Sequence, residues 1–493
     1  MLITAYTPYY TSERLRDLDF KFFTLIYKLL SWVVKQSGWS LILISCYAQT
    51  CYAHPNRWRA TWWSDPATTM AIGWDQDQKS GAILKYGVRA TYKEHGVLRY
   101  TIAVNTPRKG STHWAQLTGL SPDTEYVFKV GTPLNIDEVI APTHDGYHWS
   151  KPLWFKTAPN QPKRLTLIAG GDSRNHRAVR RVANRAVAEI KPDVVLFGGD
   201  FTSRDTKSQW REWFDDWQLS IDESGRLTPL LPTRGNHDSE KKLGRMWGRA
   251  HPRFYYALTL GGHMLRVYTL NSERPAGGHQ QQWLERDLKR HQGVLLRWAQ
   301  YHKPMRPHTR HKSEGADEYQ HWASLFSRHN VSLAIECDSH LMKVTWPLQP
   351  NRGAPDGFKR AREGTIYIGE GGWGAPLRTV DDLKPWTMAS GRLNHVFFLE
   401  VEPEGRYHVT PLQLLIEGDR EKIPTPWPWL EHPSTPKELK RLTVGVPIML
   451  AAQPLNTQGS PLIDRRATPL RLGYHPLSSG LKRLPLQFQP TYP

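Results

Sequence analysis

Apolar residues recur at alternate positions in several short stretches between residues 55 and 158. The stretches 68–74, 82–86 and 126–130 show this period, and Gly, Pro and Asp residues divide them. A period of two over four to eight residues predicts half-buried strands, and short strands at close spacing are typical of a β-sandwich. The sequence therefore predicts an all-β domain over residues 54–160.

A different pattern begins at residue 161. Continuous apolar runs at 166–170, 194–197 and 331–335 predict buried strands, while 178–190 and 280–291 have the spacing of amphipathic helices. Strands that alternate with helices indicate an α/β domain. We assign this domain to residues 161–417.

Polar residues follow the apolar runs closely. Asp172 and Asp200 each end a Gly-Gly-Asp triplet, and Asp338 lies just after the third run. The carboxyl ends of strands are where α/β folds gather their functional groups. Together with Asn236, His302 and His340, these carboxylates suit two metal ions about 3.5–4 Å apart, which can neutralise a phosphate ester and acidify a water.

The set of motifs resembles the purple acid phosphatase branch of the calcineurin-like metallophosphoesterases over roughly residues 55 to 417. Its parts are Gly-Asp172, Gly-Asp200, Gly-Asn236-His237-Asp238, a lone His302, Asp338-Ser-His340, and Gly-Leu-Ser-Pro-Asp-Thr-Glu-Tyr at 119–126. The resemblance implies an α/β fold, a two-sheet sandwich flanked by helices, after a fibronectin type III-like β-domain. That β-domain is expected to frame one wall of the active-site cleft and to contribute few catalytic groups.

The resemblance also assigns metal ligands. They are Asp172 and His340 for the first metal, Asp200 as the bridge, and Asn236, His302 and Asp338 for the second. His237 would assist the leaving group, and Arg310 with His311 best matches a basic pair near the substrate. The implied reaction is hydrolysis of a phosphomonoester by hydroxide held on the two metals.

Two positions depart from the family pattern. Ser203 stands where the family has a metal-binding Tyr, and the usual Gly-His-x-His reads Cys337-Asp-Ser-His340. The missing phenolate predicts no purple colour, and the harder oxygen of Asp338 favours Mn, Mg or Fe(II) over a ferric–zinc pair. The identity of the metals stays open among iron, manganese, zinc and magnesium. The carboxylate gained at Asp338 offsets the phenolate lost at Ser203, so the formal charge of the site is unchanged.

Several candidates also have plainer interpretations. An Asp after a strand can simply cap a helix, which applies to Asp172, Asp200 and Asp338. His302 can be an ordinary surface His, and the basic stretch around residues 310–311 also suits a solvated face. Their common order along the chain favours the metal-site interpretation.

Two further features carry less chemistry. Cys337 is a lone Cys of the kind that suggests a nucleophile, but no base and orienting group accompany it. The Gly-rich stretch 369–374 lacks the Lys-Ser/Thr of a phosphate-binding P-loop. We expect it to be a close-packed loop near the metal ligands.

Composition agrees with a multi-domain enzyme. The 493 residues carry a net charge of +19, with 39% apolar residues and 21 Trp. Positive charge can guide a phosphorylated substrate to a site or attract anionic lipid or polysaccharide. The Lys and Arg residues are dispersed and no nucleic-acid-binding motif is present, so no specific nucleic-acid partner is predicted. The sequence does not indicate an oligomeric state.

The N-terminus predicts export. Residues 22–34 and 39–48 are apolar, but a polar break separates them and each is shorter than the roughly 20 residues of a membrane span. Lys35 and the apolar run that follows it resemble the charged and apolar parts of a secretory signal. We therefore assign residues 1–53 to a signal peptide or membrane-anchor region. A lipoprotein signal at Cys46 and a membrane anchor stay open, so the expected location is periplasmic, extracellular or lipid-anchored.

Residues 418–493 contain 13 of the 37 Pro residues. Proline at this density disfavours long helices and central strands, so an extended or partly disordered tail is expected. For the whole chain, a metal-dependent phosphomonoesterase is the leading hypothesis. The alternative is a secreted non-catalytic or phosphodiesterase-type member that binds phosphorylated or anionic ligands.

Overall fold

The computed structural model describes residues 55–76, 80–107, 110–134, 145–248, 253–354 and 356–414, with the backbone of two short strands at 448–451 and 481–483. The predicted export segment lies outside the described residues. None of the described helices is long and apolar enough to cross a bilayer.

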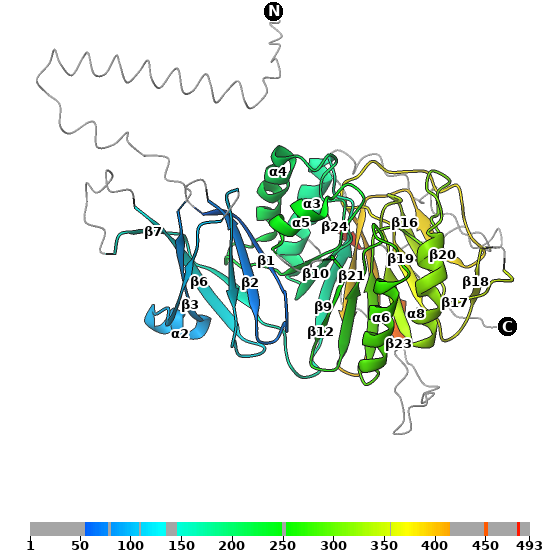
Figure 1. The fold of residues 1–493 in the computed structure, drawn as a ribbon, viewed down its shortest axis with the longest axis horizontal. Coiled ribbons are helices and arrows are strands. Elements are labelled where there is room, and N and C mark those ends of the chain that lie inside the picture. The colour runs from blue at the N-terminus through cyan, green and yellow to red at the C-terminus, as the bar shows by residue number, and fades with distance from the viewer. Residues whose placement is uncertain are drawn as a thin grey trace, which may run out of the picture. The chain divides into compact units, whose positions relative to one another are not determined.

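The first domain consists of two antiparallel sheets packed face to face (Figure 1). One contains β1 (Asn56–Thr61), β2 (Met70–Asp75) and β5 (Thr112–Leu117). The other has the order β4 (Tyr100–Val104), β3 (Ala82–Val88), β6 (Glu125–Pro133) and β7 (Tyr147–Trp149), with β8 (Leu153–Lys156) also paired to β6. The rings of Trp58 in β1 and Phe128 in β6 lie 5.8 Å apart, which joins the two sheets in one core.

The second domain contains two seven-stranded sheets. The first has the order β11 (Leu230–Pro232), β10 (Val194–Phe197), β9 (Leu165–Gly170), β21 (His395–Val401), β22 (Arg406–Leu414) and β23 (Ile448–Ala451), with β24 (Leu481–Arg483) also paired to β22. The second has the order β12 (Tyr256–Leu260), β13 (Leu265–Thr269), β14 (Leu296–Gln300), β15 (Val331–Ile335), β19 (Ile366–Gly369), β16 (Met342–Thr345) and β20 (Thr387–Gly391). A two-stranded ribbon, β17 (Leu348–Pro350) and β18 (Phe358–Arg360), stands apart.

Apolar residues on both faces of these sheets create a four-layer sandwich. Leu167 and Leu196 of the first sheet share a core with Trp298 and Leu333 of the second. On the outer face of the first sheet lie α3 (Arg177–Ile190), α4 (Lys207–Trp217) and α5 (Glu240–Met246), over a core rich in Trp and Phe. The outer face of the second carries α6 (His279–Arg290) and α8 (Ser324–Arg328), the latter after α7 (Ala316–Glu318) and a π-helical turn (Tyr319–Ala323).

The predicted fold class is confirmed: a helix-flanked two-sheet α/β sandwich follows a β-rich domain. In the Pro-rich C-terminal region, β23 and β24 add short pieces to β22 at the edge of the first sheet. The rest of that region lies outside the described residues. The two domains are in contact: Ala60 of β1 forms an isolated parallel β-bridge with Pro229 of the second domain.

Candidate metal centre

All six predicted ligands follow parallel strands of the two sheets. Strands β9, β10 and β11 run parallel in one sheet, and β14 and β15 run parallel in the other. Five of the ligands lie two to four residues beyond the carboxyl ends of these strands: Asp172, Asp200, Asn236, His302 and Asp338. His340 follows two residues after Asp338. Because the two sheets face each other, these strand ends converge.

The backbone at the ligands is unusual. Asp172, Asp200, Asp338 and His340 have φ angles of 56°, 55°, 70° and 57°. A residue with a Cβ rarely adopts this left-handed region, and such residues concentrate at functional sites. None of the three aspartates caps a helix, since α3 and α4 begin after His176 and Thr206.

Glycines make room for the carboxylates. A Cβ at Gly235 would lie 2.3 Å from Oδ1 of Asp200, and one at Gly371 would lie 1.8 Å from Oδ2 of Asp172. These contacts explain the Gly before Asn236 and the Gly-rich loop 369–374, which packs against the ligands as expected.

His302 is fully buried between carboxylates. Its Nδ1 lies 2.8 Å from the carbonyl oxygen of Gly198, which can only accept a hydrogen bond, so Nδ1 carries the proton. Its Nε2 faces Oδ1 of Asn236 at 3.0 Å, of Asp200 at 3.3 Å and of Asp338 at 3.5 Å. Although burial alone would lower the pKa of His302, the charges of Asp200 and Asp172 raise it well above its usual value.

His340 is held in the same manner. Its Nδ1 lies 2.9 Å from the carbonyl oxygen of Pro376, and its Nε2 lies 3.2 Å from Oδ1 of Asp172. A metal-binding His characteristically donates its second ring N–H to a carbonyl or carboxylate, which turns the other nitrogen toward the cation. Both histidines therefore have the orientation of metal ligands.

Two buried oxygens lack the hydrogen bonds that would satisfy them. Oδ1 of Asp172 and Oδ2 of Asp200 accept no hydrogen bond. Asp172, Asp200 and His302 can each offer one ligand atom with all three within 4.8 Å of one another. Buried carboxylate oxygens of this kind need a proton or a cation, so the residues fit a metal centre.

Asp238 supports the centre from behind. Its carboxylate accepts hydrogen bonds from the backbone N–H of Asp200 at 2.8 Å, of Gly235 at 3.0 Å and of Phe201 at 3.2 Å. These bonds tie the loop after β10 to the loop after β11. Asp238 therefore positions Asp200, a role that the sequence motif did not reveal.

His237 lies at the edge of the cluster. Its Nδ1 lies 2.7 Å from the carbonyl oxygen of Ser203, and its Nε2 lies 3.8 Å from Oδ2 of Asp200. Its side chain is 29% exposed, so Nε2 is open to a ligand that enters from solvent. At this position Ser203 contributes its main chain to the site.

Three basic residues that sequence analysis did not single out contact the cluster. Lys312 Nζ donates to Oδ1 of Asp338, Arg174 Nη1 lies 3.5 Å from Nε2 of His340, and Arg378 Nη1 lies 2.6 Å from the carbonyl oxygen of Asp338. By contrast, Arg310 and His311 are exposed, and the backbone N–H of Arg310 donates to Asp381. Lys312, the next residue along, contacts the ligand Asp338, and the substrate role of Arg310 and His311 stays a prediction. Adjacent side chains on a loop point in different directions, which sequence spacing alone does not resolve.

Cys337 is not a nucleophile in this arrangement. Burial raises the pKa of its thiol far above the usual value, and a Cβ at Gly171 or Gly198 would press on its Sγ. Reactive cysteines need the thiolate and some exposure. Cys337 therefore fills space between the two strand-end loops.

Comparisons with known proteins agree with this geometry. Residues 55–157 match the family described as "Purple acid Phosphatase, N-terminal domain", and residues 143–340 match "Calcineurin-like phosphoesterase". An uncharacterized protein of Mycobacterium tuberculosis is 24% identical over 288 residues, which cover 48% of this chain and 51% of that protein. "Probable inactive purple acid phosphatase 27" of Arabidopsis thaliana is 22% identical over 328 residues, 57% of this chain and 52% of that protein. The chain thus spans about half the length of the curated relatives it matches.

Two solved structures share the fold. A purple acid phosphatase from yellow lupin (Lupinus luteus) seeds has a TM-score of 0.56 at 15% identity and covers 74% of this chain and 73% of its own. The structure of PhoD has a TM-score of 0.55 at 11% identity and covers 74% of this chain and 88% of its own. The two matched families support a purple acid phosphatase-like metallophosphoesterase, and the two solved structures share its fold.

Proposed function

We propose that this chain is a metal-dependent hydrolase of phosphomonoesters. The observation that carries the proposal is the convergence of Asp172 and Asp200, each with one buried oxygen that accepts no hydrogen bond, with two oriented histidines. Nε2 of His340 lies 3.2 Å from Oδ1 of Asp172, and Nε2 of His302 lies 3.3 Å from Oδ1 of Asp200. Asp172, Asp200 and His340 would hold one cation, and Asp200, Asn236, His302 and Asp338 the other. Two bound cations would neutralise the phosphate oxygens and lower the pKa of an attacking water.

The surrounding residues have separate roles in this proposal. Arg174 and Lys312 place two positive charges beside the ligands, where they would bind the phosphate oxygens. His237 keeps a proton on Nδ1 for the Ser203 carbonyl, so it can deliver a proton to a leaving group only from Nε2. It would therefore act as a general acid when both nitrogens are protonated.

A non-catalytic or phosphodiesterase-type protein is the alternative. It is favoured by the Asp338–Lys312 pair, in which an internal cation already occupies a ligand oxygen, and by the word "inactive" in the name of the Arabidopsis relative. In either case the apolar and basic pattern before residue 54 supports export as part of the proposal.

Hydrolysis assays separate these functions. The purified chain, supplied in turn with Mn²⁺, Zn²⁺, Mg²⁺ or Fe²⁺, should hydrolyse p-nitrophenyl phosphate faster than bis(p-nitrophenyl) phosphate. Asp200→Asn should abolish the activity, and His237→Ala should lower kcat by about 10²–10⁴. Faster turnover of the diester would favour the phosphodiesterase, and no turnover of either ester with any metal would favour the binding protein.

A further inference from the structure

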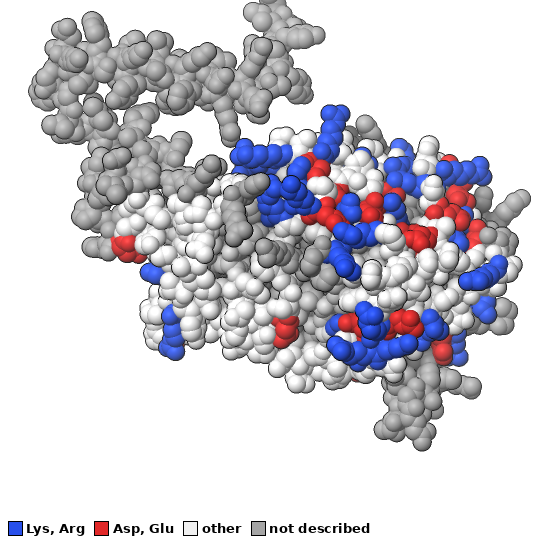
Figure 2. Space-filling view, viewed as in Figure 1, with Lys and Arg blue, Asp and Glu red and all other residues white. Residues whose placement is uncertain are grey.

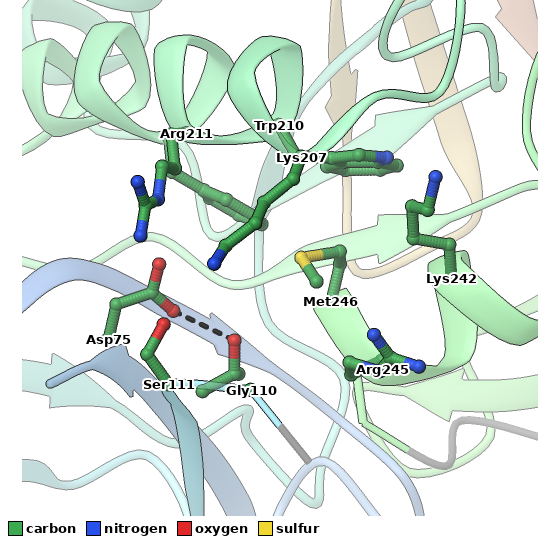
Figure 3. A pocket seen from close by; sticks show the side chains of 11 residues that line it. Asp75, Gly110, Ser111, Lys207, Trp210, Arg211, Lys242, Arg245 and Met246 are labelled. Carbon is green, nitrogen blue, oxygen red and sulfur yellow. Dashed lines mark hydrogen bonds between the residues drawn. The ribbon is translucent and has the colours of Figure 1, made fainter. Parts of the chain in front are cut away.

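A pocket lies where the β-sandwich meets α4 and α5 (Figure 3). Its volume is about 100 Å³, below the roughly 300–1,000 Å³ of sites for drug-sized ligands, so it suits a compact anion. The residues that line it are Asp75, Gly110, Ser111, Thr112, Lys207, Trp210, Arg211, Phe214, Lys242, Arg245 and Met246. None of them belongs to the metal centre.

Positive charge dominates this pocket. Lys207 and Arg211 extend from α4, and Lys242 and Arg245 project from α5. Figure 2 shows Lys and Arg side chains gathered over this part of the surface. Only one carboxylate, that of Asp75, lines the pocket.

That carboxylate is already neutralised by other groups. Asp75 lies 2.9 Å from Arg59 and 3.8 Å from Arg57, and it accepts a hydrogen bond from Thr112. Neither of these arginines lines the pocket. Asp75 therefore does not neutralise the positive charge of the lining side chains.

Three of the four lining cations have no partner in the described part of the chain. Lys207, Arg211 and Arg245 form neither an ion pair nor a side-chain hydrogen bond there, whereas Lys242 lies 3.4 Å from a carboxylate oxygen of Asp205. Like charges held close together repel one another, so a bound anion would stabilise them. Trp210, Phe214 and Met246 complete the lining with apolar surface.

We propose that this pocket binds a small anion with two or more phosphate groups, at a site distinct from the metal centre. A pocket of this size suits a compact anion, and the cationic groups that line it come from two helices, so they can contact both ends of a bisphosphate. An arginine fork at Arg211 or Arg245 matches phosphate oxygens in geometry. The proposal concerns binding, so it holds whether or not the metal centre hydrolyses a substrate.

The pocket also contacts the loop that carries His237. Lys242 Nζ donates to the carbonyl oxygen of Asp205, and Oδ2 of Asp205 accepts from the Ser239 hydroxyl at 2.6 Å. An anion that draws Lys242 toward itself must compete with Asp205. Lys242 is therefore a poor choice for a test of binding, since its removal also disturbs this loop.

Calorimetry with methylenediphosphonate, which resists hydrolysis, tests the proposal. The full chain is treated with EDTA and dialysed, so that chelation of metal contributes no heat. The wild-type chain should bind one equivalent, and Lys207→Gln/Arg211→Gln should weaken binding about tenfold or more, because charged hydrogen bonds are lost. Arg181→Gln/Arg185→Gln removes the same charge from exposed positions of α3 and should change the affinity less than about twofold.

Three outcomes would overturn the proposal. They are no binding by the wild-type chain, equal losses in both charge-removal variants, and loss of binding in Arg174→Gln with retention in the pocket variant. The second outcome would indicate diffuse attraction to a basic surface, and the third would move the anion to the metal centre. If circular dichroism shows that the double variant is unfolded, Arg245→Gln applies the same test through α5.

Discussion

Lys312 allows the sharpest perturbation of the proposed centre. Its ammonium group donates to Oδ1 of Asp338, the same oxygen that faces Nε2 of His302 at 3.5 Å. A cation that binds this oxygen must displace the lysine. Lys312→Met keeps much of the side-chain length and removes the competing charge, so the affinity for the second cation should rise.

The size of the effect follows from the burial of the pair. The side chains of Lys312 and Asp338 are 21% and 7% exposed. Two unit charges about 4 Å apart attract by about 4 kcal/mol at an effective dielectric constant of about 20, and desolvation offsets much of that energy. We therefore expect a net competition of about 1–2 kcal/mol, or roughly a 5- to 30-fold gain in affinity for the second cation.

Titration with Mn²⁺ or Zn²⁺ against a competing fluorescent chelator measures this gain directly. Lys289→Met is the matched control, because Lys289 is 59% exposed and pairs with Glu285 on the surface of α6. The Lys312 variant should also bind inorganic phosphate more weakly in the metal-loaded state, and the control should change neither affinity. Unchanged metal and phosphate affinities in Lys312→Met would refute the role assigned to this lysine.

Three further predictions concern stability and metal preference. Burial raises the pKa of Glu318 to about 7, so the folded chain holds a proton that the unfolded chain releases, and stability is lost as pH rises toward that value. Glu318→Gln should therefore be more stable than wild type by about 3 kcal/mol at pH 8 and about equally stable at pH 5. An equal difference at both pH values would contradict this cause. Asp216 is 3% exposed and pairs with Arg177 and with the buried Arg180. Asp216→Ala should therefore lower the free energy of unfolding, measured by chemical denaturation, by about 3–5 kcal/mol. A loss below about 1 kcal/mol, as for a surface pair, would contradict this prediction. Asp338→His should keep two metals and shift preference toward Zn because imidazole is softer, whereas elemental analysis that shows only one metal would remove Asp338 from the ligands.

Buried strands were the most predictable part of the fold. The apolar runs 194–197 and 331–335 coincide with β10 and β15, and the helical stretch 280–291 lies within one residue of α6. Strands buried on both faces read as continuous apolar runs, which the sequence displays directly. These two runs and the run 166–170, which lies in β9, locate the loops that carry Asp200, Asp338 and Asp172.

The surroundings of the ligands could not be predicted, because they depend on tertiary contacts. Nothing in the local sequence indicates that Lys312 turns inward while His311 stays exposed, or that Arg174 lies beside His340. The contact of Asp238 with three backbone N–H groups likewise requires two loops from different strands. The roles predicted for His237, Arg310 and His311 stay predictions.

Metal content is the most direct test of the proposed centre. The purified chain is reconstituted with Mn²⁺, Zn²⁺ or Fe²⁺, passed through a desalting column and analysed by inductively coupled plasma mass spectrometry beside Asp200→Asn. Because Oδ2 of Asp200 is buried without a hydrogen bond and Oδ1 faces His302, its charge should be essential for holding two cations at close range. We predict two equivalents of metal in the wild-type chain and at most one in the variant; a wild-type chain that retains no metal, or a variant that retains both, would contradict the dinuclear centre.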